Sequence, residues 1–417
     1  MSDSIDILRF ATAGSVDDGK STLIGRLLFD TKGVFTDQLE ALEGTSYSEE
    51  QKGIDLALIT DGLKAEREQG ITIDVAYRYF STPKRKFIIA DTPGHVQYTR
   101  NMFTGASNSD LAIILIDSRN GVQQQSKRHL YISWLLGIKN IIVAINKMDL
   151  IDYDKKRFDY LSKDFLSITK NLSIPHIDFV PISALKGDMI VSRGENMKWY
   201  KGPTLIEILE TVEINYLDKK DSSRFPVQLV NRVNDETTKD FRGYMGTLMS
   251  GTLAVGDSIK ILPSNRETKI KEIILSSMNV DTISSDDSAT IVLDEEIDIS
   301  RGDMFSSIED QPEVSNTISA RICWMDEQKL NLKNKYLLKH CNKISKALIK
   351  EILYKVDMET LNHVSADSVL EMNDIAQVEI MLQNQIAFDS YKRNKKTGSF
   401  IIIDSESNNT VAAGTIL

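Results

Sequence analysis

The segment Gly14-Ser15-Val16-Asp17-Asp18-Gly19-Lys20-Ser21 follows an apolar run at Ile7–Ala13 and precedes a helical pattern at Ser21–Phe29. A G-x-x-x-x-G-K-S pattern between a strand and a helix is typical of a phosphate-binding loop, in which backbone amides and the helix N-terminus bind phosphate oxygens. We expect Lys20 to reach the β- and γ-phosphates of a nucleotide and the Ser21 hydroxyl to bind Mg²⁺. The predicted binding loop continues to Thr22.

The first half of the chain alternates short apolar runs with longer amphipathic segments. Helices are expected at Ser21–Phe29, Gln125–Leu136 and Leu205–Ile214. This alternation predicts a mainly parallel sheet covered by helices, an α/β P-loop domain. The expected strands are Ile7–Ala13, Ile73–Phe80, Phe87–Ala90, Leu111–Ile116, Ile141–Ile145 and Phe179–Ile182.

The second half has a different pattern, beginning at Phe225. Short β-type runs are separated there by Gly, Asn and Asp, and helical periodicity is scarce, which is typical of antiparallel barrels. We therefore predict a nucleotide-binding P-loop domain at 1–218 and two antiparallel β-barrel domains at 222–309 and 310–417. The runs that mark the first barrel are Val227–Val230, Gly246–Ser250, Ser258–Leu262 and Ala289–Leu293.

Composition narrows the class of protein. The 417 residues carry a net charge of −10, so the surface as a whole does not favour nucleic acid or anionic lipid. Two cysteines, Cys323 and Cys341, rule out a disulfide framework and favour a reducing compartment. No basic and apolar leader begins the sequence, and no apolar run is long enough to span a bilayer. We expect a cytoplasmic protein that contacts no membrane.

Three further motifs follow predicted strands in a fixed order. Asp91-Thr92-Pro93-Gly94-His95 follows the third run, Asn146-Lys147-Met148-Asp149 the fifth, and Ser183-Ala184-Leu185 the sixth. The Asp91 carboxylate is placed to hold Mg²⁺ through a water, and the Gly94 amide to approach the γ-phosphate. Because open α/β sheets bind ligands at the carboxyl ends of their strands, these motifs are expected to meet at one nucleotide site.

The Asn146–Asp149 motif indicates guanine as the base. The Asp149 carboxylate can accept hydrogen bonds from guanine N1–H and the 2-amino group, whereas adenine would leave the carboxylate unpaired. The amides of Ser183, Ala184 and Leu185 are expected to contact guanine O6. Together the four motifs predict a GTPase with Mg²⁺ as its cofactor.

The segment Glu66–Ile73, with the sequence EREQGITI, resembles the R-x-x-G-I-T-I switch of the elongation factor Tu superfamily. The resemblance implies that Thr72 binds Mg²⁺ when the γ-phosphate is present, and that His95 orients the attacking water. Val16 and Ile71 match an apolar gate that shields this water. Asp17 matches a position linked to a monovalent cation.

Within this superfamily the chain resembles the large, GTPase subunit of bacterial sulfate adenylyltransferase nearly end to end. Translation factors usually have His and Thr at the positions of Asp18 and Ser21. The matching segments are 15–28, 97–102, 105–107, 135–139, 241–243, 298–303 and 398–404. The resemblance implies that GTP hydrolysis is coupled to formation of adenosine 5′-phosphosulfate by a separate small catalytic subunit, which uses ATP and sulfate.

Some features depart from that family or leave another function open. Val233 stands where the family usually has Pro, and the segment Asp235–Lys239 is longer than usual. The alternative function is delivery of aminoacyl-tRNA, supported by the predicted barrels and by a basic stretch, Lys329–Lys350. This stretch contains seven lysines and no acidic residue. It is interpreted first as a solvated barrel face, with RNA binding and docking to an acidic partner as alternatives.

Overall fold

The computed structural model describes residues 6–32, 72, 74–214, 222–233, 241–365 and 369–417. The switch residues 66–71 and 73, and the departure at Asp235–Lys239, lie outside the described residues. Contacts divide the chain into two compact units, residues 1–214 with 357–362, and residues 215–356 with 363–417. The domain limits at 218, 222, 309 and 310 stay predictions.

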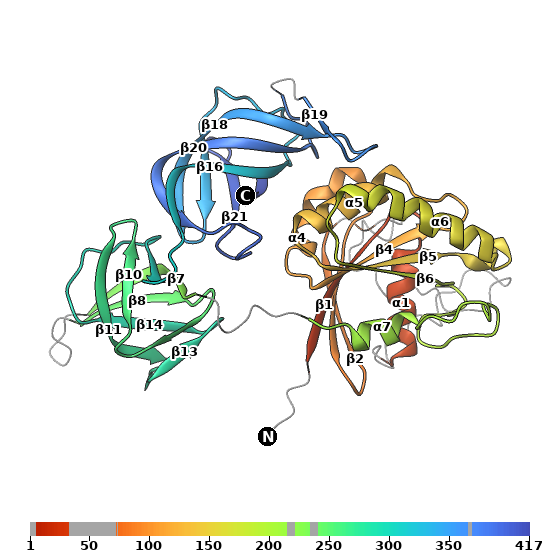
Figure 1. The fold of residues 1–417 in the computed structure, drawn as a ribbon, viewed down its shortest axis with the longest axis horizontal. Coiled ribbons are helices and arrows are strands. Elements are labelled where there is room, and N and C mark those ends of the chain that lie inside the picture. The colour runs from red at the N-terminus through yellow and green to blue at the C-terminus, as the bar shows by residue number, and fades with distance from the viewer. Residues whose placement is uncertain (1–5, 33–71, 73, 215–221, 234–240, 366–368) are drawn as a thin grey trace. The chain divides into compact units, whose positions relative to one another are not determined.

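The first unit contains the predicted, mainly parallel sheet, in the order β2-β3-β1-β4-β5-β6 (Figure 1). Only β2 runs antiparallel to its neighbour. All seven residues of β4 are buried, as expected for an apolar central strand covered on both faces. The strands are β1 (Ile7–Ala13), β2 (Ala76–Ser81), β3 (Lys86–Asp91), β4 (Leu111–Asp117), β5 (Asn140–Asn146) and β6 (His176–Pro181).

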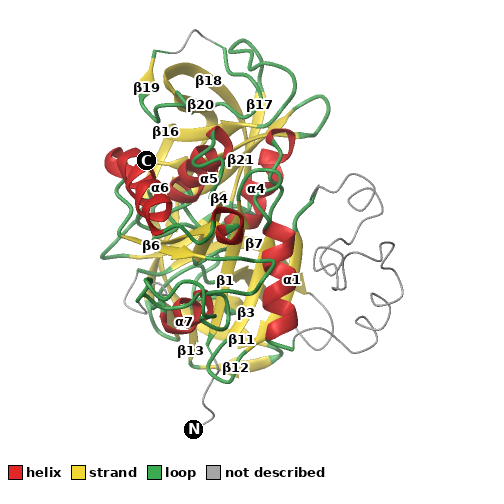
Figure 2. Ribbon diagram, turned by 90° about the vertical axis from the view of Figure 1, so that its right-hand side faces the viewer, coloured by secondary structure: helices red, strands yellow, loops and turns green. Residues whose placement is uncertain are grey.

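Helices flank this sheet, and α1 runs alongside it directly after the phosphate-binding loop (Figure 2). The helix α7 begins with a capping box, because Thr204 and Glu207 satisfy each other's backbone amides. The α-helices are α1 (Lys20–Asp30), α4 (Thr99–Ala106), α5 (Gln124–Leu135), α6 (Lys155–Ile168) and α7 (Leu205–Thr211); the 3₁₀ helices are η2 (Val96–Tyr98), η3 (Met148–Ile151) and η4 (Thr169–Asn171).

The second unit contains the two predicted antiparallel barrels. The first barrel has the strand order β10-β15-β7-β8-β14-β11 and closes through pairing of β10 with β11. Its core includes Phe225, Tyr244 and Phe305. Its strands are β7 (Arg224–Val233), β8 (Phe241–Thr247), β10 (Ser258–Leu262), β11 (Arg266–Leu275), β14 (Ser288–Leu293) and β15 (Met304–Ser307), with the short strands β9 (Thr252–Ala254), β12 (Met278–Val280) and β13 (Thr282–Ser284).

The second barrel has the order β17-β21-β22-β16-β20-β18 and closes through pairing of β17 with β18. Trp324 and Tyr336 meet in its core with ring centroids 5.9 Å apart. Its strands are β16 (Glu313–Trp324), β17 (Tyr336–His340), β18 (Lys343–Val356), β20 (Ile375–Phe388), β21 (Ser399–Asp404) and β22 (Thr410–Ile416), with the short strand β19 (His363–Val364).

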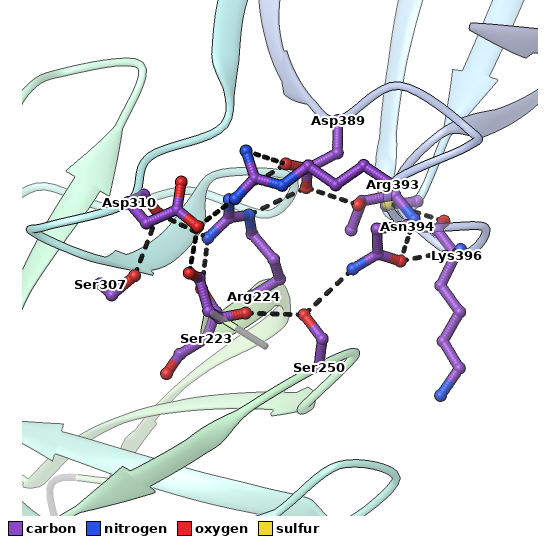
Figure 3. A network of polar contacts seen from close by, with 12 residues as sticks. Ser223, Arg224, Ser250, Ser307, Asp310, Asp389, Arg393, Asn394 and Lys396 are labelled. Atoms are coloured by element: carbon purple, nitrogen blue, oxygen red, sulfur yellow. Dashed lines mark hydrogen bonds and ion pairs between the residues drawn. The ribbon is translucent and has the colours of Figure 1, made fainter. Parts of the chain in front are cut away.

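A buried ion pair joins the start of β7 to the segment after β20 within the second unit (Figure 3). Arg224 Nε and Nη2 donate to the Asp389 carboxylate at 2.9 and 3.0 Å, and the two side chains are 2% and 1% exposed. Asp389 also accepts from Thr397 Oγ1 at 2.7 Å, and Asn394 Nδ2 donates to Ser250 Oγ at 3.0 Å. The hydrogen bonds to Asp389 compensate two charges held away from water.

The basic stretch is part of the second unit and is partly neutralised there. Lys329 pairs with Glu371, Lys343 with Asp303 and Lys350 with Glu379, at 2.7, 3.5 and 2.8 Å. This pairing supports the interpretation as a solvated barrel face. No helix in the described part of the chain is long and apolar enough to cross a membrane.

Candidate nucleotide site

A cavity of about 520 Å³ in the first unit collects side chains from several predicted motifs. The motifs meet there because β1, β3 and β5 are parallel and end at the same edge of the sheet. The lining residues are Val16, Asp17, Gly19, Lys20, Ser21, Thr22, Thr72, Gly94, His95, Arg119 and Lys147.

The phosphate-binding loop closes around the Lys20 side chain. Gly19 is the N-cap of α1 and has a φ of 89°, a conformation that favours glycine, and Asp17 also has a positive φ of 67°. Lys20 Nζ donates to the carbonyl oxygens of Gly14 and Ser15 at 3.0 and 3.1 Å. Burial lowers the pKa of Lys20. The ammonium therefore has two neutral partners that a phosphate oxygen can replace.

Gly94 approaches this loop so closely that no larger residue fits. A Cβ atom on Gly94 would lie 2.3 Å from Lys20 Nζ and 2.6 Å from the Gly14 carbonyl oxygen. The backbone of the Asp91–His95 segment therefore lies directly over the Lys20 ammonium, as expected of an amide that approaches a γ-phosphate.

Asp18 ties the loop to neighbouring elements and does not line the cavity. Its buried carboxylate accepts from the Ser15 amide at 2.6 Å, and burial is the main cause that raises its pKa to about 6. Its carbonyl oxygen accepts from Asn146 Nδ2 at 2.8 Å.

Asn146 connects the predicted phosphate and guanine elements. Besides its bond to Asp18, it accepts from the Ala184 amide at 3.0 Å through Oδ1. Ser183 Oγ donates to Asp149 Oδ1 at 2.6 Å, which holds the carboxylate predicted to recognise guanine. Asn146, Asp149, Ser183, Ala184 and Leu185 thus lie together, beside Lys147 in the cavity wall.

Two residues of the site were not predicted from the sequence. Asp117 ends β4, is 1% exposed, and pairs with Lys147 Nζ at 3.1 Å and Arg119 Nη2 at 2.7 Å. Despite burial, the hydrogen bonds from Arg119 and Lys147 lower the pKa of Asp117 to about 2. Arg119 itself lines the cavity. A polar residue directly after the predicted strand Leu111–Ile116 was the available signal.

The predicted hydrolysis residues lie around the same cavity. Thr72 and Ser21 line it, and Asp91 is buried at the end of β3, with its Oδ1 3.5 Å from Thr12 Oγ1. Hydroxyl and carboxylate oxygens suit Mg²⁺, so this donor set fits the predicted ion. His95 Nδ1 accepts from the Gln97 amide at 3.3 Å, which orients its ring at the start of η2.

The other histidines show no metal-binding arrangement. His129 and His340 are buried, whereas His176 and His363 are exposed. Among the described residues, no group of three or more His, Cys, Asp or Glu side chains is placed to hold a metal ion.

Comparison with known proteins shows the family to which this chain is similar. Residues 5–239 match the family described as "Elongation factor Tu GTP binding domain", and residues 317–417 match "GTP-eEF1A C-terminal domain-like". The chain is 50% identical over 414 residues to "Sulfate adenylyltransferase subunit 1" of Saccharophagus degradans, covering 99% of this chain and 87% of the relative. The chain belongs to the sulfate adenylyltransferase subunit 1 family.

Another member of this family, from Cellvibrio japonicus, is 51% identical over 418 residues, covering 99% of this chain and 87% of the relative. The solved structure "Crystal structure of bacterial selenocysteine-specific elongation factor EF-Sec" is 20% identical, with a TM-score of 0.46, and covers 99% of this chain and 58% of that one. Membership of the subunit 1 family and the elongation-factor-type domain together make this chain a GTP-binding GTPase. The family name also implies a further subunit.

Proposed function

We propose that this chain hydrolyses GTP and couples hydrolysis to formation of adenosine 5′-phosphosulfate and pyrophosphate from ATP and sulfate. The adenylyl transfer would take place on a separate small catalytic subunit. The main support is the cavity that brings Lys20, Gly94, His95 and Lys147 together in a chain with near full-length likeness to sulfate adenylyltransferase subunit 1. The sequence contains one phosphate-binding loop, so ATP is assigned to the partner.

The phosphate end of the cavity would hold the triphosphate through backbone amides of residues 14–22 and the Lys20 ammonium. Ser21 and Thr72 would hold Mg²⁺ directly, and Asp91 would hold it through a water. When bound, Mg²⁺ neutralises charge on the β- and γ-phosphate oxygens. Lys20 adds a positive charge that is already desolvated, so it requires little reorganisation as negative charge develops.

His95 would orient the water that attacks the γ-phosphate. Its Nδ1 accepts from the Gln97 amide, so its Nε2 remains for a ligand, and its ring lines the cavity. Val16 lines the cavity as well and would act as one side of the apolar gate. The Asp17 side chain, also in the cavity wall, would contact a monovalent cation.

The base end would select guanine. Asp149, held by Ser183, would accept from guanine N1–H and the 2-amino group, and the 183–185 loop would contact O6. Lys147 would lie along the base, held by Asp117.

The coupling has a thermodynamic reason, because the mixed anhydride in adenosine 5′-phosphosulfate forms very unfavourably. GTP would order Thr72 and the residues around His95, changing contacts with the small subunit, and hydrolysis would release them. The test is to co-purify a tagged chain with the candidate small subunit and to assay sulfate activation with and without GTP. We expect a stable complex whose product yield rises with GTP. A chain that forms no such complex would refute the proposal.

A further inference from the structure

Arg26 reaches from α1 to the loop predicted to contact the base. Its Nε donates to the Ala184 carbonyl oxygen at 3.3 Å and its Nη2 to the Leu185 carbonyl oxygen at 2.7 Å. The side chain is 20% exposed. It lies along the turn, since a Cβ atom on Gly187 would be 3.7 Å from Arg26 Cδ. One guanidinium therefore holds two successive carbonyl groups, which suits its planar fork of donors.

The two carbonyl groups determine where the next two amides point. In a trans peptide the C=O and N–H groups point in opposite directions. Fixing the Ala184 carbonyl toward α1 therefore turns the Leu185 amide away from α1. No hydrogen-bond acceptor for this amide lies among the described residues. It is the one amide of Ser183, Ala184 and Leu185 left for a ligand in this part of the structure, because Ser183 donates to the Asp188 carbonyl and Ala184 to Asn146.

The second carbonyl connects Arg26 to the carboxylate of the predicted base site. The Leu185 carbonyl shares its peptide with the Lys186 amide, which donates to Ser183 Oγ at 3.2 Å. Ser183 Oγ in turn donates to Asp149 Oδ1 at 2.6 Å. An uninterrupted series of hydrogen bonds and one peptide thus runs from Arg26 to Asp149.

We infer that Arg26 is a positioning residue for guanine recognition, which holds the Leu185 amide toward O6 and keeps the Ser183–Asp149 hydrogen bond in place. The inference rests on the proposed guanine contacts of the 183–185 loop and Asp149. Arg26 itself touches neither base nor phosphate in this arrangement. It acts through two backbone carbonyls, so a lysine, which lacks the planar fork, can reproduce only part of its effect.

The competing explanation is an ordinary salt bridge on a helix surface. Arg26 Nη1 lies 3.4 Å from Asp30 Oδ1, an i,i+4 pair of the kind that contributes little to stability. Asp30→Asn removes this ion pair and leaves the donors to Ala184 and Leu185 in place. It is therefore the matched control for Arg26→Ala.

The experiment measures dissociation constants of GDP and of 2-aminopurine riboside diphosphate, which keeps the 2-amino group but lacks O6 and the proton on N1. Wild-type, Arg26→Ala, Arg26→Lys and Asp30→Asn chains are compared, and thermal unfolding without nucleotide shows whether each variant is folded. In the wild type we expect the loss of O6 and N1–H to weaken binding about tenfold or more. An equal affinity of the wild type for both ligands would refute the proposed contacts to O6 and N1–H themselves.

If the wild type binds the analogue more weakly than GDP, Arg26→Ala should bind GDP about tenfold more weakly than the wild type does. Its affinity for the analogue should differ from that of the wild type by less than about threefold. Arg26→Lys should restore only part of the GDP affinity, and Asp30→Asn should match the wild type. A folded Arg26→Ala chain that loses the same factor for both ligands, or for neither, would overturn the positioning role.

Discussion

Replacing Asn146 by alanine tests the connection between the phosphate loop and the base loop. The side chain is 1% exposed and makes two hydrogen bonds, to the Asp18 carbonyl at 2.8 Å and from the Ala184 amide at 3.0 Å. Each buried group left without its partner costs about 1–3 kcal/mol. Leaving both the Asp18 carbonyl and the Ala184 amide without a partner would therefore cost about 2–6 kcal/mol. Water that enters from the cavity can bind these groups, so the cost should lie near the lower end of this range.

We therefore expect Asn146→Ala to raise the dissociation constants of GTP and GDP by about 30-fold, the equivalent of about 2 kcal/mol. Isothermal titration calorimetry measures this directly. Asn140→Ala, at the opposite end of the same strand β5, is the control and should bind normally. If Asn146→Ala binds both nucleotides as tightly as the control, the argument that this side chain holds the two loops together is wrong.

Three further outcomes follow from the structure. Arg224→Met should lower the free energy of unfolding of the second unit by about 3 kcal/mol in urea titrations, the low end for a broken buried pair, because Asp389 keeps a buried charge whose remaining cation, Arg393 Nη1, lies 3.6 Å away; a change below about 1 kcal/mol would contradict this. His95→Ala should slow GTP hydrolysis while GTP affinity stays near normal; equal loss of both would indicate a structural role. Burial, with smaller contributions from Lys20 and Arg128, lowers the pKa of His129 to about 3. Below about pH 6.5 the His129 imidazole therefore binds a proton in the unfolded chain but stays neutral in the folded chain. The free energy of unfolding consequently falls by up to about 1.4 kcal/mol for each unit by which the pH decreases. His129→Gln should reduce the dependence of the free energy of unfolding on pH, measured by urea titrations between pH 6.5 and 4.5. An unchanged dependence would contradict the assignment to His129.

The fold was largely predictable because its signals are local. The run Ile7–Ala13 is β1 and the run Ser258–Leu262 is β10, both with the predicted bounds. The run predicted at Ile73–Phe80 was less accurate, since β2 begins at Ala76. Its residues alternate between exposed and covered, as on an edge strand, so apolar content is a weaker guide there. The helices α4 and α6 were not predicted.

The site was predictable where chemistry requires a fixed spacing and not where it depends on contacts across the sheet. The phosphate loop and the Asn146–Asp149 motif have patterns that function itself imposes. Arg26 acts through Ala184, 158 positions away, so no local pattern marks it. The local signal for Asp117 was its place directly after a predicted strand, whereas its contact with Lys147 spans 30 positions. Arg119 was missed because a single arginine after a strand is common.

The central claim, energetic coupling, is tested most directly by counting two products in one reaction. The purified complex of this chain and the small subunit receives ATP and sulfate with either GTP or a non-hydrolysable GTP analogue, and both phosphate released from GTP and adenosine 5′-phosphosulfate are measured. We expect the yield of adenosine 5′-phosphosulfate per ATP to rise in step with GTP hydrolysis. With the analogue, we expect the yield to stay at the low level measured without GTP. The same yield with GTP and with the analogue would contradict the account.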